Sequence, residues 1–266
     1  MCGVVGIYHK KENACGDIYD ALIQVQHRGQ DAAGISTWDS SKMSTYKELG
    51  LVTEVFKSKE SLENLVGNMG IGHVRYPTAG GDNVNEAQPF YTANPINVTL
   101  AHNGTLTNSE KLKKDLVKTH FCQFNTNSDS EVLLNLFCYE LHKINFRKLT
   151  KNHVYAALKN VFKKCSGGYA VVMLVAGIGI VAFRDPKGIR PLSIGKNKRS
   201  YLIASESSAI TALDYNLLGD ITPGQVVIIN NNGEIDKKRL VKNNIHQPCL
   251  FEYVYFSRPD STIDEI

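Results

Sequence analysis

The sequence has few cysteines, little net charge and no long apolar segment. Its six cysteines, at positions 2, 15, 122, 138, 165 and 249, form no close pairs of the kind that bind zinc or build a disulfide framework. The N-terminus has no basic leader followed by an apolar stretch, which argues against an export signal. Together these absences favour a cytoplasmic protein.

The longest apolar run, 169–183, is too short to cross a membrane. A spanning helix needs about 20 residues, and Gly177 and Gly179 interrupt this run. We therefore expect a buried β-hairpin there and no membrane association. The net charge of +4 over 266 residues is spread over separate short basic stretches. Nucleic acid is not an expected partner, because its binding requires basic residues gathered on one face.

What the sequence does contain is a series of short β-rich segments around two helical patterns. Apolar residues recur at intervals of three and four over 129–142 and 153–165, which indicates amphipathic helices. Ser128 and Glu131 have the spacing of a capping box before the first. This order differs from strict βα alternation and predicts an α+β domain with helices packed on sheets. The strand-like segments are 2–9, 34–38, 70–76, 97–103, 169–176, 179–185, 201–206 and 225–230.

Cys2 directly follows the initiator methionine and is the first candidate for chemistry. A thiol needs a base, because the thiolate is the reactive form. If the methionine is removed, the free α-amine, with a reference pKa of about 7.7–8.0, can take the proton itself. The alternative is that Cys2 is only the first side chain of a buried strand. The residue alone does not decide between the two.

Three later segments add polar residues at strand ends and turns. Arg28 and Gly29 lie in a turn before a strand, Arg75 ends a strand, and Asn103-Gly104 ends another. Each is also typical of an ordinary loop, since Asn-Gly is a common hairpin turn. Their ordered occurrence behind an N-terminal cysteine favours a catalytic site.

Nine segments together resemble the amidophosphoribosyltransferase family, also called glutamine phosphoribosylpyrophosphate amidotransferases. The motifs occur in the same order and with compatible spacing from the first residue to the last. The resemblance implies a class II glutamine amidotransferase (glutaminase) domain at 2–235, with the four-layer α/β/β/α sandwich of N-terminal nucleophile hydrolases. The segments are Cys2-Gly3, HRGQDAAG, GIGHVRYPTAG, EAQPFY, LAHNGTLTN, NSDSE, FRDPKGIRPL, ASES and FEYVYFSRPDS.

The resemblance also implies the catalytic roles. Cys2 would attack the side-chain amide of L-glutamine, release ammonia and leave a thioester that water hydrolyses. The Asn103 side chain and the Gly104 N–H would form the oxyanion hole, which the tetrahedral intermediate requires. Arg28 and Gly29 would belong to the loop that closes near the nucleophile.

Substrate recognition is implied in the same way. Arg75 and Asp129 would bind the α-carboxylate and α-amine of glutamine, and Thr78 would contact the substrate from the loop after Arg75. Asp129 is also a favourable charge in the first turn of a helix, and the two roles are compatible. His73 and His102 precede two of these residues in the chain. With an α-amine available as the base, we interpret both as structural.

The family's second half is not recognisable in this sequence. We assign 236–266 to a linker and the start of a phosphoribosyltransferase domain whose acidic run and Gly-Thr-Thr loop, the site of Mg²⁺ and phosphoribosyl pyrophosphate, are missing. No metal or cofactor is therefore expected in this chain. The implied function is to supply ammonia for 5-phosphoribosylamine formation, the first step of purine synthesis. The partner domain is either fused or separately encoded, and a homo-oligomer stays open.

Two other functions compete with this one. Another class II amidotransferase, such as a glucosamine-phosphate or asparagine synthetase, fits less well, because 26–34 and 251–261 resemble the phosphoribosyl family. A truncated, catalytically silent remnant would keep the fold without turnover. Cys249 is interpreted as structural, since one thiol cannot hold an iron–sulfur cluster that needs four ligands. Without a partner domain, residues 250–256 are expected to expose apolar side chains.

Overall fold

The computed structural model describes residues 1–76, 83–120, 122–144, 146–198, 200–242 and 245–266. The strands are β1 (Gly3–Tyr8), β2 (Ala32–Trp38), β3 (Met43–Leu49), β4 (Met69–Arg75), β5 (Phe90–Thr92), β6 (Val98–Leu106), β7 (Gly167–Val175), β8 (Gly179–Arg184), β9 (Ser193–Asn197), β10 (Ser200–Ala204), β11 (Asn216–Asp220), β12 (Gln225–Asn230) and β13 (Ile235–Arg239). The α-helices are α1 (Cys15–Gln24), α2 (Val52–Val55), α3 (Lys59–Glu63), α4 (Ser109–His120), α5 (Asp129–His142), α6 (Lys151–Lys164) and α7 (Ser207–Ala212). Short 3₁₀ turns are η1 (Gln26–Arg28) and η2 (Val84–Glu86), and η3 (Glu252–Phe256) is a π-helical turn.

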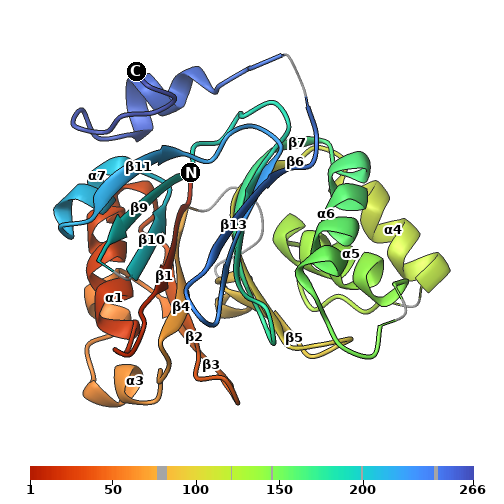
Figure 1. Ribbon diagram of the computed structural model, residues 1–266, viewed down its shortest axis with the longest axis horizontal. Helices are drawn as coiled ribbons and strands as arrows, with labels where there is room; N and C mark the ends of the chain where they lie inside the picture. Colours follow the sequence, from red (N-terminus) through yellow and green to blue (C-terminus); the bar gives the residue numbers. More distant parts are fainter. Residues whose placement is uncertain (77–82, 121, 145, 199, 243–244) are drawn as a thin grey trace.

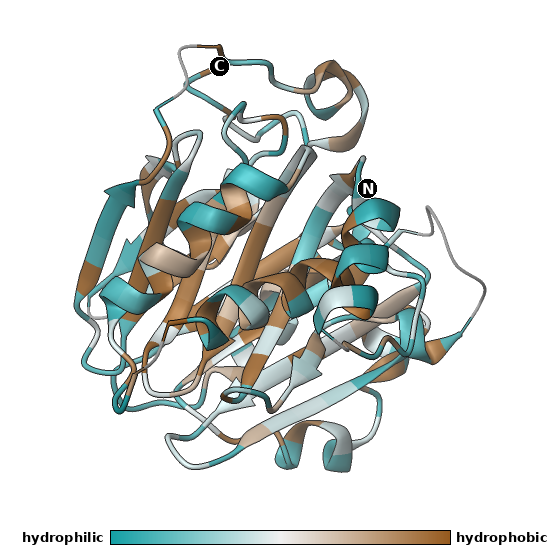
Figure 2. Cartoon of the chain, turned by 90° about the vertical axis from the view of Figure 1, so that its right-hand side faces the viewer, coloured by the Kyte–Doolittle hydropathy of each residue, from teal (hydrophilic) through white to brown (hydrophobic). Residues whose placement is uncertain are grey.

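Two antiparallel sheets face each other, with helices on both outer sides (Figure 1). One sheet has the strand order β11-β9-β10-β1-β4-β2-β3, and the other has the order β13-β12-β8-β7-β6-β5. Helices α1 and α7 cover the first sheet, while α4, α5 and α6 cover the second. In Figure 2, helices α4 to α6 carry many hydrophilic residues and lie in front of strands that are largely hydrophobic.

The alternation of side chains along the strands creates these layers. On β1, Val5 and Ile7 pack into the apolar cluster beneath α1 and α7, whereas Val4 packs into the cluster between the sheets. On β7, Met173 faces the α5 and α6 side and Val172 faces the other sheet. Both faces of each central strand are therefore buried, which explains their nearly continuous apolar sequences. The four-layer α/β/β/α arrangement agrees with the prediction.

Most predicted elements are present. The helix predicted at 129–142 is α5. The helix predicted at 153–165 is α6, which begins two residues earlier than predicted and ends one residue earlier. The apolar run 169–183 forms the hairpin β7–β8. The prediction missed β3, β5, β9, β11 and β13. Four of these five are edge strands, and most of their side chains are partly exposed, so they lack the apolar runs that mark central strands.

The start of α5 differs from the predicted capping box. The Ser128 hydroxyl accepts a hydrogen bond from the Ser130 N–H, so it caps the helix as expected. The Glu131 carboxylate, however, accepts from the N–H groups of Asn125 and Thr126 in the preceding loop. The reciprocal half of the capping box is therefore wrong, because the loop before the helix offers Glu131 other donors.

The C-terminal segment 245–266 leaves the sandwich and lies across the end where the N-terminus emerges (Figure 1). Its buried contacts include a bidentate pair between Arg184 and Asp264, at 2.5 and 2.7 Å. The carboxylate of Asp185, the next residue in the chain, accepts backbone N–H groups instead. The predicted domain boundary at 235/236 falls inside β13 and stays a prediction.

Apolar side chains of the C-terminal segment are exposed, as expected for residues 250–256. Leu250, Phe251, Val254 and Tyr255 are each more than 60% exposed. The segment also appears as a hydrophobic stretch at the top of Figure 2. None of the helices in the described part of the chain is long and apolar enough to cross a membrane.

Candidate active site

Cys2 immediately precedes β1, at the edge of the sheet where β1 begins and its antiparallel neighbour β4 ends. The register of these strands pairs Gly3 with Val74, so Cys2 and Arg75 emerge side by side. Because alternate residues share a face, Cys2 points, like Val4, into the layer between the sheets. The Tyr76 N–H donates to the Cys2 sulfur at 3.5 Å, and the thiol lies 3.9 Å from the Tyr76 carbonyl.

The environment of Cys2 keeps its thiol protonated. Burial raises the pKa of the Cys2 thiol, and the Asp129 carboxylate acts in the same direction. The contact with Tyr76 and the charge of Arg28 oppose this shift. In the described part of the chain, the hydrogen bonds to the sulfur come from the Tyr76 backbone alone. A base for the thiol must therefore come from elsewhere.

The N-terminal amine lies in the same environment. Burial lowers the pKa of the Met1 amine to about 6, helped by the positive charges of Arg28 and Arg190 and opposed by Cys2 and Glu252. An α-amine in this place is mostly uncharged at neutral pH. The position of the chain end therefore suits proton uptake, provided that the amine belongs to the nucleophilic residue.

Arg28 supports the backbone of the nucleophile. Its guanidinium is fully buried between two carboxylates, 2.6 Å from Glu206 and 2.6 Å from Glu252. Its Nε donates to the Cys2 carbonyl at 3.1 Å. These contacts join η1, the loop after β10 and the C-terminal segment at one point. Arg28 thus holds Cys2 in position through the main chain.

Gly29 allows this loop to approach β4 closely. Its φ of −164° is extended, which any residue can adopt. A Cβ at Gly29, however, would lie 2.5 Å from the Arg75 carbonyl carbon and 2.7 Å from the Val74 oxygen. A side chain here would push the loop away from the strand that carries Arg75.

Asn103 and Gly104 lie on β6, across the sandwich from Cys2. The two sheets are linked at this level, because His73 Nε2 on β4 lies 3.2 Å from the His102 carbonyl on β6. Asn103 shares its face with Ala101, which packs between the sheets. Its side chain is fully buried, and neither its amide nitrogen nor its oxygen has a hydrogen-bond partner in the described residues. Such an orphaned group costs stability, which points to a role outside folding.

Position 104 requires glycine for two reasons. Its φ of +148° is strained for any other residue, and a Cβ would clash with the Gly168 carbonyl of the paired strand β7. The chain thus places a backbone conformation that only glycine adopts readily next to the Asn103 amide, which has no partner among the described residues. This arrangement suits two donors aimed at one developing charge.

The residues predicted to bind the amino acid also lie here, with partners of their own. Arg75 is nearly buried and donates to the Asp31 carboxylate at 2.5 Å. Asp129, the first residue of α5, accepts from the Leu106 N–H at 2.8 Å and lies 3.7 Å from His102 Nδ1. Its charge adds to the effect of burial in raising the pKa of the Cys2 thiol, and its part in substrate binding stays a prediction. Thr78 lies outside the described residues.

His73 and His102 are buried rather than placed as bases for Cys2. Burial lowers the pKa of His73 to about 3. Burial also lowers the pKa of His102, against the opposing charge of Asp129. His102 Nδ1 lies 2.9 Å from the Ser130 hydroxyl, so the ring ties β6 to α5. Both stay neutral at physiological pH, in agreement with a structural role.

Sequence reasoning missed the groups that support the site. Asp31 pairs with Arg75, the Tyr76 backbone contacts the thiol, and Glu252 pairs with Arg28. Glu206 also pairs with Arg28, and both side chains are fully buried. A pocket of about 490 Å³ opens beside these groups. Its lining residues are His27, Arg28, Gln30, Asp31, Tyr76, Tyr255 and Phe256.

Comparison with known proteins agrees with this geometry. A family model for the glutamine amidotransferase domain matches residues 73–212, which include Arg75, Asn103, Gly104 and Asp129. The chain belongs to this glutamine amidotransferase family. The fold is the four-layer sandwich of the N-terminal nucleophile hydrolase type, as predicted.

Similar proteins cover the whole chain. It is 48% identical to the amidophosphoribosyltransferase of Pseudomonas aeruginosa and 47% identical to that of Escherichia coli, in both cases over 100% of this chain and 54% of the relative. The solved structure of glutamine phosphoribosylpyrophosphate amidotransferase from B. subtilis superposes with a TM-score of 0.86 and 37% identity. That match covers 100% of this chain and 55% of the other. The chain spans about half the length of the curated relatives it matches.

Proposed function

We propose that this chain is the glutaminase part of an amidophosphoribosyltransferase. Cys2, exposed by removal of Met1, hydrolyses L-glutamine, and the ammonia serves 5-phosphoribosylamine formation in purine biosynthesis. The observation that carries the proposal is the buried side chain of Asn103, which has no hydrogen-bond partner among the described residues and lies in the layer that Cys2 faces. The transfer step belongs to a phosphoribosyltransferase domain, fused or separately encoded. Six unpaired cysteines fit a reducing compartment such as the cytoplasm.

The mechanism follows from the groups at the N-terminus. After Met1 is removed, the α-amine of Cys2 takes the thiol proton, and the sulfur attacks the side-chain carbonyl carbon of glutamine. The oxyanion is met by the Asn103 amide and the Gly104 N–H. The protonated amine then gives its proton to the leaving nitrogen, ammonia departs, and a thioester remains. Water adds to the thioester with the amine again as base, which releases glutamate and restores the thiol.

Substrate binding uses one cation and one anion. The Arg75 guanidinium binds the α-carboxylate, and Asp31 holds the arginine from the other side. The Asp129 carboxylate binds the α-ammonium at the start of α5, and Thr78 contacts the substrate. Arg28 and Gly29 keep the loop beside the nucleophile in place. A free amino acid carries both charges, so this pair discriminates against peptides and simple amides.

The test is intact mass spectrometry after incubation with 6-diazo-5-oxo-norleucine, an electrophilic glutamine analogue. We expect a mass that lacks Met1 and carries one adduct in the wild type, and no adduct in Cys2→Ala. Glutamate release by residues 1–266 assayed without an acceptor domain is expected to be slow, because such a domain would help to close the site. Retained methionine, or no adduct on processed protein, would leave the catalytically silent remnant as the better interpretation.

A further inference from the structure

A second cluster of reactive side chains lies at the other end of β1. His9, which follows β1 directly, is 95% buried. Its Nδ1 lies 2.8 Å from the Ser200 hydroxyl, and its Nε2 lies 2.9 Å from the Asp17 carboxylate. Seven residues of extended chain separate Cys2 from His9, which corresponds to about 23 Å. The two clusters are therefore separate.

One neutral tautomer of the His9 imidazole can make both hydrogen bonds. With the ring proton on Nε2, the imidazole donates to Asp17, and Nδ1 accepts from the Ser200 hydroxyl. This is the relation among nucleophile, base and orienting carboxylate in serine hydrolases, with the two ring nitrogens exchanged. The hydrogen bond from His9 lowers the pKa of Asp17 despite its partial burial, so the carboxylate is ionised at neutral pH.

Separate elements hold the three residues. The His9 N–H donates to the Asn68 carbonyl at 2.7 Å, and the Asn68 amide donates to the His9 carbonyl at 2.8 Å. Asp17 lies in the first turn of α1, where the Tyr215 hydroxyl is 3.4 Å from its carboxylate. Ser200 begins β10 and pairs with Asn197 of β9. The cluster is thus fixed by the fold and does not depend on mobile side chains.

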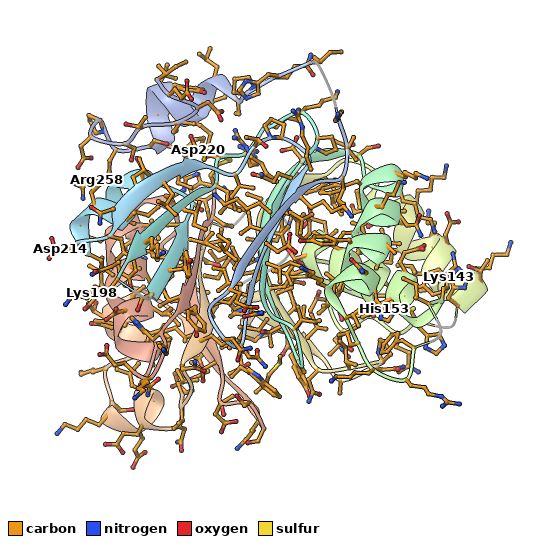
Figure 3. All side chains as sticks on the ribbon, in the orientation of Figure 1. Lys143, His153, Lys198, Asp214, Asp220 and Arg258 are labelled. Atoms are coloured by element: carbon orange, nitrogen blue, oxygen red, sulfur yellow. The ribbon has the colours of Figure 1, made fainter. Side chains whose placement is uncertain are left out.

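The cluster lines a pocket of about 520 Å³. Three lysines, Lys10, Lys11 and Lys198, share its lining with the carboxylates of Glu12 and Asp17. Lys198, labelled in Figure 3, lies on the side of the molecule that carries α1. Because His9 already engages Asp17, the rim presents more free positive than negative charge. A ligand with an anionic group fits this balance.

We propose that Ser200, His9 and Asp17 form a second catalytic site that hydrolyses carboxylic esters carrying an anionic group. The Ser200 oxygen attacks the ester carbonyl while its proton passes to His9 Nδ1. The carbon–oxygen bond of the ester then breaks, and His9 gives the proton to the departing alcohol. Water, deprotonated by His9, releases the acid and restores Ser200. The lysines bind the anionic group and face the developing oxyanion.

The test uses the full chain with Cys2→Ala, which removes the competing thiol. Release of nitrophenolate from p-nitrophenyl monosuccinate is compared with release from neutral p-nitrophenyl acetate. Ser200→Ala and His9→Gln are each expected to lower the rate of nitrophenolate release from the succinate ester by about 10²-fold or more. Lys198→Ala is expected to raise KM by a larger factor for the succinate ester than for the acetate ester, because only the succinate ester carries the anionic group.

A matched control keeps folding separate from chemistry. Ser41 also hydrogen-bonds to a side chain, since its hydroxyl donates to the Asp39 carboxylate at 2.7 Å, but it lies outside this pocket. Ser41→Ala is expected to keep the full rate. A fluorophosphonate probe should label the unsubstituted serine, with the adduct mapped to Ser200 by peptide mass spectrometry. Three results would each overturn the proposal. They are nitrophenolate release from the succinate ester at the rate seen in buffer, nitrophenolate release that persists in Ser200→Ala, and no adduct at saturating probe.

Discussion

A nucleophilic side chain lies near each end of β1, and the two have different surroundings. At one end, the hydrogen bonds of the Cys2 thiol within the described residues are with the Tyr76 backbone, and the N-terminal amine lies nearby. At the other end, the Ser200 hydroxyl contacts the His9 ring, which contacts the Asp17 carboxylate. A thiol beside its own amine needs no side-chain base, whereas a hydroxyl needs two further residues.

The energetic setting of the two ends differs as well. Near Cys2, the Asn103 amide is buried without a partner among the described residues, and Arg28 is buried between two carboxylates. Near His9, the amide of Asn68 donates to the His9 carbonyl. The two ends therefore differ in whether their buried amides are already paired before a ligand binds.

The largest expected effect comes from covering the α-amine. A variant with an uncleavable peptide ahead of Cys2 turns that amine into an amide, which cannot accept the thiol proton. We expect glutamine hydrolysis to fall on the order of 10⁴-fold or more, the scale seen when a nucleophile or its base is removed. A coupled glutamate assay measures the loss.

The same peptide attached after Ile266 serves as the control and should leave the rate unchanged. In the covered variant, ester hydrolysis at Ser200 is expected to continue, because His9 supplies that base. Glutaminase activity that survives the extension would mean that a group other than the amine activates Cys2.

The second prediction compares the effects of Asn103→Leu and Asn68→Leu on catalysis and on stability. Asn103→Leu should lower kcat for glutamine hydrolysis by about 10²–10³-fold through loss of an oxyanion donor. The same change removes a buried, unpartnered amide and should raise the free energy of unfolding by about 1–3 kcal/mol. Asn68→Leu, which removes a partnered amide at the other end, should lower it by about 1 kcal/mol. Urea unfolding measures both, and a destabilised Asn103→Leu would contradict this account.

The third effect concerns the buried charges that hold Cys2. Burial alone would raise the pKa of Glu206, but hydrogen bonds from His27 and Arg28 and the charge of Arg28 outweigh it and lower the pKa from 4.5 to about 2. A depressed pKa stabilises the fold above pH 4.5, and this contribution disappears as the pH falls toward 2. The shift corresponds to about 3 kcal/mol.

Glu206→Gln should therefore be less stable than the wild type at pH 7, and the difference should narrow between pH 4.5 and 2. Thermal unfolding at several pH values measures it. Asp260→Asn, which removes an exposed carboxylate paired with Arg258, should leave the pH profile unchanged. A Glu206→Gln difference that stays constant with pH would show that the pair contributes through packing alone.

The sequence predicted the parts of the fold and site that leave a local pattern. Periodic apolar residues predicted α5 and α6. Arg75 ends β4 as expected, whereas the Asn103-Gly104 pair does not end its strand, because β6 continues to Leu106. The roles of these residues and of Cys2 in catalysis stay predictions. Edge strands such as β13 escaped, since half-exposed residues lack the apolar run of a central strand.

Long-range partners leave no such pattern. Arg28 meets Glu206 and Glu252 across 178 and 224 residues of chain, and His9 meets Ser200 across 191. Each is an ordinary polar residue within its own segment. Only the topology, which places β10 beside β1 and the C-terminal segment over the N-terminus, brings them together. The contacts that orient a nucleophile are therefore less predictable than the nucleophile itself.

The smallest effect is expected from Tyr215→Phe at the His9 end. The lost hydroxyl contacts Asp17 at 3.4 Å, whereas the stronger contact of Asp17 with His9 remains. We expect the free energy of unfolding to change by less than about 1 kcal/mol. Ester release should fall by less than about tenfold, because an ionised Asp17 still orients the ring, and glutamine hydrolysis should not change. A loss as large as that of Ser200→Ala would place Tyr215 at the substrate, and it would make the His9 end a four-residue site.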